Sequence, residues 1–290
     1  MNLIQIYKEF PTHESCIDHL EKVRWGDKPK CPYCKSDKQT PLKEKQQRYH
    51  CNNCNTSYSV TVGTIFHDTK LDLQKWFLAI SLILNAKKGI SSRQLARDLE
   101  TRPNTAWRMQ MQIRKAMVES GSLLQGIIEA DETFIGGKEK NKHKNKRTPN
   151  NQGRSNKTKT PILSAIERDG KVVAKKAKDT TGKSIKSFLN RNIEKGSQVM
   201  TDEWRAYRGI SKNFEHFVIK HNSGEYVRGN VHTNSIENFW SLLKRGITGQ
   251  YHWLSDKYLG KYIDEFCFRH NHRKTENLFD LVVLRAVNTF

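Results

Sequence analysis

Two closely spaced cysteine pairs restrict the N-terminal part of the chain more than any other sequence feature. Cys31-Pro32-Tyr33-Cys34 and Cys51-Asn52-Asn53-Cys54 are separated by sixteen residues, 35–50. Each pair can form a tight turn that presents two sulfurs, and two such turns complete the tetrahedron of a four-thiolate zinc site. Segments 48–50 and 56–60 have the composition of short strands. The spacing therefore predicts a zinc ribbon, with Zn²⁺ bound by Cys31, Cys34, Cys51 and Cys54.

Other uses of these cysteines fit the sequence less well. The chain holds 6 cysteines in 290 residues, too few for a disulfide scaffold, and residues 1–9 lack the apolar centre of a secretory signal. A redox dithiol or two disulfides is the alternative. Because the ribbon has few apolar residues, we expect metal binding to supply its folding free energy. The pattern leaves open whether the ribbon contacts nucleic acid, and Cys16 and Cys267 are interpreted as packed thiols.

The charge balance points to a polyanionic partner. Lysine and arginine total 51 against 30 acidic residues, which gives a net charge of +21. Such an excess attracts nucleic acid and releases its counterions, although a solubilising basic surface or a ribosome-associated protein is the alternative. The longest apolar stretch, 76–84, is far shorter than the roughly 20 residues of a membrane helix. We therefore expect no membrane partner and a cytoplasmic location.

Residues 71–118 have helical character and resemble a helix-turn-helix. Ser91 or Ser92 can cap a helix that turns Leu95 and Leu99 to one face, and residues 101–104 then break the chain. A second helix would present polar side chains to a DNA groove, with Arg108 as the predicted DNA contact. An ordinary helical hairpin is the alternative, because this periodicity is weakly specific.

From Gly126 the pattern changes to strands. Residues 126–134, 161–167, 171–177 and 197–202 are predicted strands, with a helix at 183–192 before the last of them. This is the element order of a ribonuclease-H-like core, in which the first and fourth strands lie side by side.

Carboxylates end both of those strands. Asp131 and Asp202 would face each other, and their hard oxygens favour Mg²⁺ or Mn²⁺. Alternation along the strand puts Glu129 on the same face as Asp131, so Glu129 is the main rival for this site. Glu132 and Glu203 should point the other way.

A third carboxylate is expected from a helix at 234–245. Glu237 and Lys244 are seven residues apart, close to two turns, so they share a face and could bind a metal ion and a DNA phosphate respectively. The alternative for Glu237 is a capping box with Asn234 as the N-cap. His232 just before the helix is either a contact for the scissile phosphate or a solvated loop residue.

A basic insertion at 138–159 separates the first two predicted strands of this core. It holds nine lysines and arginines and one acidic residue, with almost no apolar side chain. We expect a mobile loop that clamps DNA through phosphates, with Lys144, Lys146 and Arg147 among the contacts. An inert solvated loop is the alternative.

Three stretches carry a resemblance to a known family: residues 129–138, 201–207 and 232–247. They resemble the DDE-type transposases of bacterial insertion sequences, in the branch that joins a zinc ribbon to an ISXO2-like catalytic domain; residues 262–273 resemble that family's closing helix. The resemblance implies that Asp131, Asp202 and Glu237 bind the catalytic ions and that Lys244 assists on DNA. It also implies hydrolysis at element ends and attack of the 3′ hydroxyls on target DNA. His232 and Arg245 join the predicted DNA contacts.

Together these features predict an α+β multidomain protein. Residues 1–65 form a zinc ribbon with an N-terminal helix, residues 66–122 a helix-turn-helix-like DNA-binding region, and residues 123–290 a ribonuclease-H-like α/β catalytic domain. The expected function is that of an insertion-sequence transposase on double-stranded DNA, namely terminal inverted repeats and target, as a homodimer or larger oligomer near the bacterial nucleoid. A nuclease of the same fold and a noncatalytic DNA-binding regulator are the alternatives.

Overall fold

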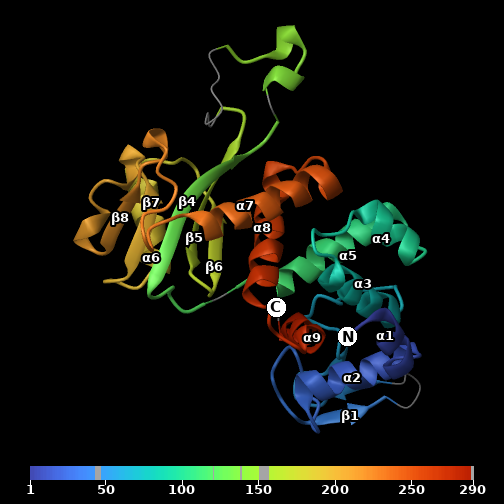
Figure 1. The fold of residues 1–290 in the computed structure, drawn as a ribbon. Helices are drawn as coiled ribbons and strands as arrows, with labels where there is room; N and C mark the ends of the chain where they lie inside the picture. The colour runs from blue at the N-terminus through green and yellow to red at the C-terminus, as the bar shows by residue number, and fades with distance from the viewer. Residues whose placement is uncertain (43–46, 120, 138, 150–156, 289–290) are drawn as a thin grey trace. The chain divides into compact units, whose positions relative to one another are not determined.

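The protein, described here by a computed structural model, forms two compact units (Figure 1). The structure describes residues 1–42, 47–119, 121–137, 139–149 and 157–288. Unit 1 contains Met1–Val118 together with the segment from Lys274 onward, and unit 2 contains Glu119–Arg273. This division differs from the expected domains, because the ribbon and the helical region share one unit and the C-terminal segment joins them.

Unit 1 is mainly helical. Its helices are α1 (Leu3–Glu9), α2 (His13–Trp25), α3 (Leu73–Asn85), α4 (Ser92–Asp98), α5 (Pro103–Ala116) and α9 (Leu278–Asn288). The Ser91 side chain caps α4 by accepting from the N–H of Gln94, as expected. The rings of Phe10, Phe77 and Phe279 pack against one another. This apolar contact explains why α9 belongs to unit 1 rather than to the unit that precedes it in the chain.

The ribbon is a small antiparallel sheet in unit 1. It contains β1 (Gln39–Pro41), β2 (Arg48–Cys51) and β3 (Thr56–Ser59), in that order. Strands β2 and β3 were expected, whereas β1 was not. Helix α2 is joined to the ribbon through Arg24, whose Nη1 donates to the carbonyls of Val60 and Val62 at 2.6 and 2.7 Å.

Unit 2 is built around a five-stranded sheet in the order β6-β5-β4-β7-β8. The strands are β4 (Ile127–Ile135), β5 (Thr160–Glu167), β6 (Val172–Lys176), β7 (Gln198–Asp202) and β8 (Glu215–Ile219). The β4–β5 and β5–β6 pairs are antiparallel, and β7 and β8 run parallel to β4. This topology confirms the expected ribonuclease-H-like core; β8 was not among the predicted strands.

Helices cover both faces of this sheet (Figure 1). Helix α6 (Gly182–Asn192) packs on one face, and α7 (Asn234–Gly246) and α8 (Asp256–Asn271) pack on the other. Strand β5 shows how the sequence produces this arrangement, because Ile162 faces α7 and α8 whereas the next residue, Leu163, faces α6. Among the helices in the described part of the chain, none is both long and apolar enough to span a bilayer.

Candidate functional site

The four predicted zinc ligands converge at one point of the ribbon. The Sγ atoms of Cys31 and Cys54 are 3.6 Å apart, and those of Cys34 and Cys51 are 3.5 Å apart. All four sulfurs lie within 4.8 Å of one another. Four thiolates bound to Zn²⁺ at about 2.3 Å in a tetrahedron are separated by roughly 3.8 Å, so this donor set fits zinc in chemistry and in size.

Both cysteine pairs use the same backbone turn. The N–H of Lys35 donates to the carbonyl of Cys31, and the N–H of Asn55 donates to that of Cys51, each at 2.9 Å. Lys35 and Asn55 have φ of 63° and 57°, in the left-handed region that closes such a turn. A hydrogen bond from the Ser36 backbone, followed by one from the Asn53 side chain, lowers the pKa of the Cys34 thiol to about 6. The Cys34 side chain therefore favours the thiolate that a metal needs.

The remaining cysteines lie apart from this cluster and are packed. Cys16 in α2 and Cys267 in α8 are both buried. Burial raises the pKa of each thiol to about 12, so both stay protonated at neutral pH.

A carboxylate cluster lies where β4 and β7 run side by side. Glu129 of β4 is paired with Met200 of β7, so Asp131 and Asp202 are each two residues further along parallel strands. Carboxylate oxygens of Asp131, Asp202 and Glu132 all lie within 4.8 Å of one another. The strand order therefore brings the two predicted aspartates together.

Glu132 lies closer to the aspartates than strand alternation suggested. Its Oε2 accepts a hydrogen bond from the buried Tyr207 hydroxyl at 2.9 Å, on the α6 side of the sheet. Alternation fixes the direction of Cβ, but the longer glutamate side chain still carries its carboxylate into the cluster with Asp131. Burial, followed by the Glu132 charge, raises the pKa of Tyr207 well above its ordinary value, so the phenol is a hydrogen-bond donor.

The cluster opens into a pocket of about 580 Å³ in unit 2. Strand and helix residues share its wall: Asp131, Glu132, Thr133, Phe134, Lys159, Asp202, His221, Thr233, Glu237, Trp240, Ser241 and Lys244. Helix α7 supplies Glu237, Trp240 and Lys244, and the Nε1 of Trp240 donates to Asp131 Oδ2 at 2.9 Å. The predicted metal-binding residues therefore line one cavity, together with the predicted lysine.

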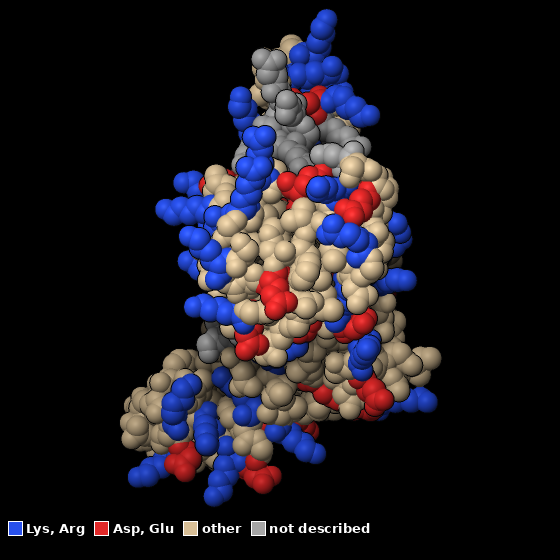
Figure 2. Space-filling model, turned by 60° about the vertical axis from the view of Figure 1, so that its left-hand side comes forward, with Lys and Arg blue, Asp and Glu red and all other residues tan. Residues whose placement is uncertain are grey.

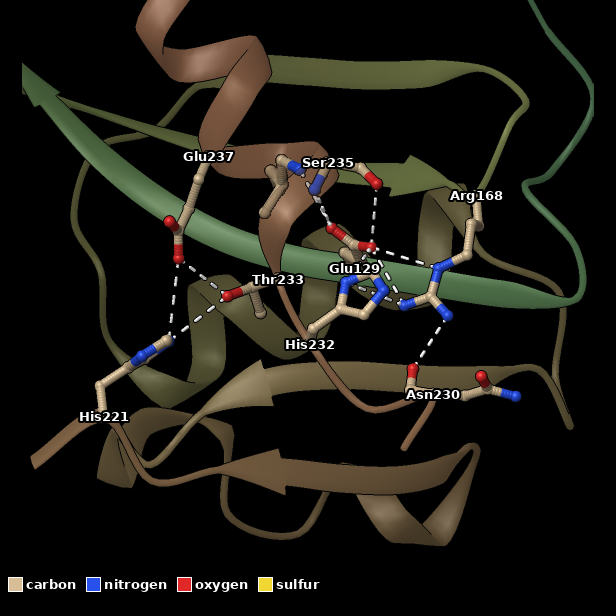
Figure 3. Close-up of polar contacts among 9 residues, drawn as sticks. Glu129, Arg168, His221, Asn230, His232, Thr233, Ser235 and Glu237 are labelled. Carbon is tan, nitrogen blue, oxygen red and sulfur yellow. Dashed lines mark hydrogen bonds and ion pairs between the residues drawn. The ribbon is translucent and has the colours of Figure 1, made fainter. Parts of the chain in front are cut away.

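Glu237 lines the pocket but its carboxylate lies outside the close cluster. Its Oε1 accepts from the Thr233 hydroxyl at 3.0 Å and lies 3.8 Å from Nε2 of His221 (Figure 3). The capping box does not form, because Thr233 rather than Asn234 is the N-cap of α7 and it makes no side-chain cap bond. The Glu237 side chain is 55% exposed and so remains accessible from the cavity.

Glu129, the main rival for the metal site, lies outside the pocket. Its side chain is fully buried, with hydrogen-bond donors from Arg168, Ser235 and Ile236 around it (Figure 3). Although it is on the same face of β4 as Asp131, its oxygens are occupied by protein donors. The structure thus gives Glu129 a different environment from that of the aspartates.

The predicted DNA contacts fall into separate places. His232 is directed at Glu129, with Nδ1 3.2 Å from Oε1, and it does not line the pocket (Figure 3). Arg245 is exposed in the last turn of α7. Arg108 is exposed on α5 and lines a pocket of about 470 Å³ in unit 1 together with Asn104 and other α5 residues. Only Lys244 of the predicted DNA contacts lies in the carboxylate pocket.

The basic insertion is partly described. Residues 138 and 150–156 lie outside the described part, and the rest contains two short 3₁₀ turns, Glu139–Asn141 and Lys144–Lys146. Lys144, Lys146 and Arg147 are exposed. Phe134 of β4 and Lys159, the last residue of the insertion, both line the carboxylate pocket.

Two family comparisons match this architecture. The family described as the ISXO2-like transposase domain matches residues 123–271, and the transposase zinc-ribbon domain matches residues 11–57. The chain belongs to the ISXO2-like transposase family. It is a DDE-type DNA transposase, as the sequence resemblance implied. The chain is also 27% identical over 259 residues to an uncharacterized protein in transposable element ISH50 of Halobacterium salinarum, covering 86% of this chain and 85% of that protein.

Solved structures resemble the chain only distantly. The simian T-cell lymphotropic virus intasome in complex with PP2A regulatory subunit B56 gamma matches at 15% identity with a TM-score of 0.31, covering 60% of this chain and 63% of that chain. The Mos1 strand transfer complex matches at 15% identity with a TM-score of 0.30, covering 72% and 78%.

Several pocket residues of the transposase were not singled out from the sequence, among them His221, Lys159 and Trp240. His221 follows β8 and faces Glu237, and Lys159 ends the basic insertion. Trp240 lies within the stretch 232–247 that carries the family resemblance, but it was given no role of its own. The position of Trp240 one turn after Glu237 was the available signal, because residues three apart on a helix share a face. His221 carried no local signal.

The Asp131 carboxyl of the transposase has an unusually high pKa. Burial, assisted by the charges of Asp202 and Glu237, raises its pKa from 3.8 to about 6. Hydrogen bonds from the Glu132 backbone and the Trp240 side chain oppose this rise. The folded protein therefore holds this proton more tightly than the unfolded chain does. The stabilisation is present below pH 4 and is lost as the pH rises through 6.

We expect Asp131→Asn to stabilise the magnesium-free, zinc-loaded transposase at pH 8 by about 1–3 kcal/mol, and to leave its stability unchanged at pH 4. Urea unfolding of both proteins at the two pH values measures the difference. Equal effects at both pH values would contradict this account of the carboxyl.

Proposed function

We propose that this transposase hydrolyses the ends of its element and joins the exposed 3′ hydroxyls to target DNA in the carboxylate pocket. The observation that carries the proposal is the meeting of Asp131 and Asp202 at neighbouring parallel strands, in a cavity that Glu237 and Lys244 also line. The pocket thereby combines two kinds of chemical group. Its carboxylates suit a divalent ion, and its lysine suits a phosphate.

The donor set fits Mg²⁺ or Mn²⁺. Asp131, Asp202 and Glu237 offer only hard oxygen atoms, and the cluster also contains Glu132. We propose that the first three hold the catalytic ions, with a rotation of the exposed Glu237 side chain toward the aspartates. When bound, the divalent ions would lower the pKa of the attacking water or hydroxyl and stabilise charge on the leaving oxygen.

The protein's own side chains prepare this site. Trp240 orients Asp131 through its hydrogen bond, and Thr233 holds Glu237 at the pocket wall. Burial lowers the pKa of Lys244 below its ordinary value, and the Asp131 charge offsets only part of this effect. We propose that Lys244 binds a phosphate beside the scissile bond, because a partly desolvated cation interacts strongly with a phosphate oxygen.

Double-stranded DNA is the proposed partner. Figure 2 shows lysine and arginine side chains spread over the visible face and gathered on the projecting part at the top, where the described part of the insertion lies. We propose that Lys144, Lys146 and Arg147 contact backbone phosphates, because they are exposed cations of an insertion whose last residue, Lys159, lines the pocket. Arg108 and Arg245 are proposed as further contacts, and a dimer or larger oligomer would bring two ends together.

The ribbon is proposed to hold one Zn²⁺ at its four cysteines. Converging sulfurs and a donor set of thiolates support this choice over magnesium, which prefers oxygen. We propose a structural role for the ion, because the core around the cysteines contains few other apolar side chains, namely Trp25, Tyr49, Tyr58 and Val62.

A joining assay tests the proposed reaction. Duplexes made from the inverted repeats that flank the gene are incubated with the zinc-loaded protein, a supercoiled target plasmid and Mn²⁺. We expect labelled 3′ ends covalently joined to the plasmid. Hydrolysis without any joined product would favour a nuclease of the same fold, and DNA binding without either reaction would favour a noncatalytic regulator.

A further inference from the structure

Glu129 is a fully buried carboxylate two residues before Asp131. Its Oε1 accepts from Nε and Nη2 of Arg168 at 3.3 and 3.1 Å, and from the Ser235 hydroxyl at 3.0 Å. His232 Nδ1 lies 3.2 Å from the same oxygen (Figure 3). The site chemistry described above leaves this group without a function, although a buried charge with so many partners is costly to assemble.

The other oxygen of Glu129 holds the start of α7. Its Oε2 accepts from the backbone N–H groups of Ser235 and Ile236 at 2.7 and 3.1 Å. These are the second and third residues of the helix, whose own N-cap, Thr233, makes no side-chain cap bond. Glu129 therefore accepts the hydrogen bonds that an N-cap side chain would normally accept, although it belongs to a distant strand. Its negative charge is also favourable at the positive end of the helix dipole.

A second contact joins the same helix to the same strand. Trp240 of α7 donates to Asp131 of β4. Two residues along a strand span about 6.7 Å, and the five residues from Ser235 to Trp240 span roughly 7.5 Å of helix. The two lengths match, so α7 is fastened to β4 at two points, and Glu237 lies between them in the sequence.

Arg168 extends this fastening to the chain that enters the helix. It follows β5, and its Nη1 donates to the carbonyl of Asn230 at 2.9 Å while Nη2 contacts Glu129 (Figure 3). The carboxylate thus has a counter-ion that also holds the segment leading to Thr233. Both the approach to α7 and its first turn depend on the charge of Glu129.

We propose that Glu129 is a positioning residue that fixes the start of α7 on β4 and so places Glu237 relative to Asp131 and Asp202. It contacts neither the ions nor the DNA. This inference rests on the proposed function, because it requires Glu237 to take part in binding the ions. Glu129, the main rival for the metal site in the sequence, thus positions the third proposed ligand, Glu237, instead of binding the ions itself.

The affinity of the zinc-loaded full-length protein for Mn²⁺ tests the inference. It is obtained from a titration in which electron paramagnetic resonance measures the free Mn²⁺. We expect Glu129→Gln, which keeps the shape and removes the charge, to weaken binding about 10- to 100-fold, the range typical for groups that orient metal ligands. Glu194→Gln, an exposed carboxylate after α6, is the matched control and should bind as wild type. Wild-type affinity in Glu129→Gln would overturn the inference.

A double variant shows whether the effect passes through Glu237. In the Glu237→Ala background, Glu129→Gln should cause no further loss of affinity, because the ligand that it positions is already absent. An equal loss in both backgrounds would overturn the inference. Wild-type Mn²⁺ binding in Asp131→Asn would instead contradict the proposed function, so the two failures are distinguishable.

A double variant that removes both charges of the Glu129–Arg168 pair keeps the test valid if the single variant does not fold. If Glu129→Gln unfolds because the half-buried Arg168 is left without its counter-ion, Glu129→Gln combined with Arg168→Gln removes both charges of the pair. This double variant should fold, as judged by circular dichroism, and should still bind Mn²⁺ about 10-fold or more weakly. Folding with wild-type affinity would contradict the positioning role.

Discussion

Asp202→Asn is expected to reduce strand joining by about a thousandfold or more while the protein stays folded. Asp202 ends β7 and its carboxylate lies within 4.8 Å of those of Asp131 and Glu132. An amide at this position removes one anionic ligand from a site where bound ions contribute several kcal/mol to the transition state. Because each 1.36 kcal/mol changes the rate tenfold, the loss should span at least three decades.

The measurement is the single-turnover rate of joining terminal-repeat DNA to a plasmid in saturating Mn²⁺. Glu215→Gln provides the control, because Glu215 is exposed on the neighbouring strand β8 and outside the pocket. The control should join DNA at the wild-type rate. A rate within tenfold of wild type for Asp202→Asn would exclude this carboxylate from catalysis.

Cys51→Ser is expected to have the largest effect on stability. Cys51 is fully buried in the ribbon, and its Sγ lies 3.5 Å from that of Cys34. Structural zinc sites contribute on the order of 10 kcal/mol to folding, and a serine hydroxyl is a poor replacement for a thiolate. We therefore expect loss of bound zinc and unfolding of β2 and β3, with the unit 2 sheet retained.

Metal analysis and amide hydrogen exchange measure the two parts of this prediction. Cys267→Ser serves as the control, since this buried thiol lies in unit 2 and outside the cysteine cluster. That variant should retain one zinc per chain and a protected ribbon. A Cys51→Ser protein with full zinc content and protected β2 amides would show that the ribbon does not depend on the four-cysteine site.

The features that the sequence predicted well depend on short-range patterns. The cysteine pairs reveal the four-cysteine cluster because each turn is closed within five residues, from Cys31 to Lys35 and from Cys51 to Asn55. The strand order can be predicted from the sequence because buried strands, turns and a helix follow one another along the chain. The turn between β5 and β6 is at Asp169, which has a φ of 59°. From that order, the meeting of Asp131 and Asp202 follows.

The features that the sequence concealed depend on partners far along the chain. Glu129 receives its hydrogen bonds from Ser235 and Ile236, which are 106 and 107 residues away. A nearby Asn234 resembled a local cap, so the cap supplied by a distant strand left no sequence signal. Similarly, the apolar sequence of α9 does not reveal which unit the helix packs against. Only the structure shows that Phe279 packs with Phe10 and Phe77.

The position of bound Mn²⁺ in a crystal of the zinc-loaded protein tests the central claim most directly. An anomalous difference map should show Mn²⁺ in the pocket, bound by Asp131 and Asp202 with Glu237 turned toward them. Glu129 should remain on the first turn of α7. Manganese held by Asp131, Asp202 and Glu132 without Glu237, or bound at Glu129, would contradict the assignment of the three catalytic carboxylates.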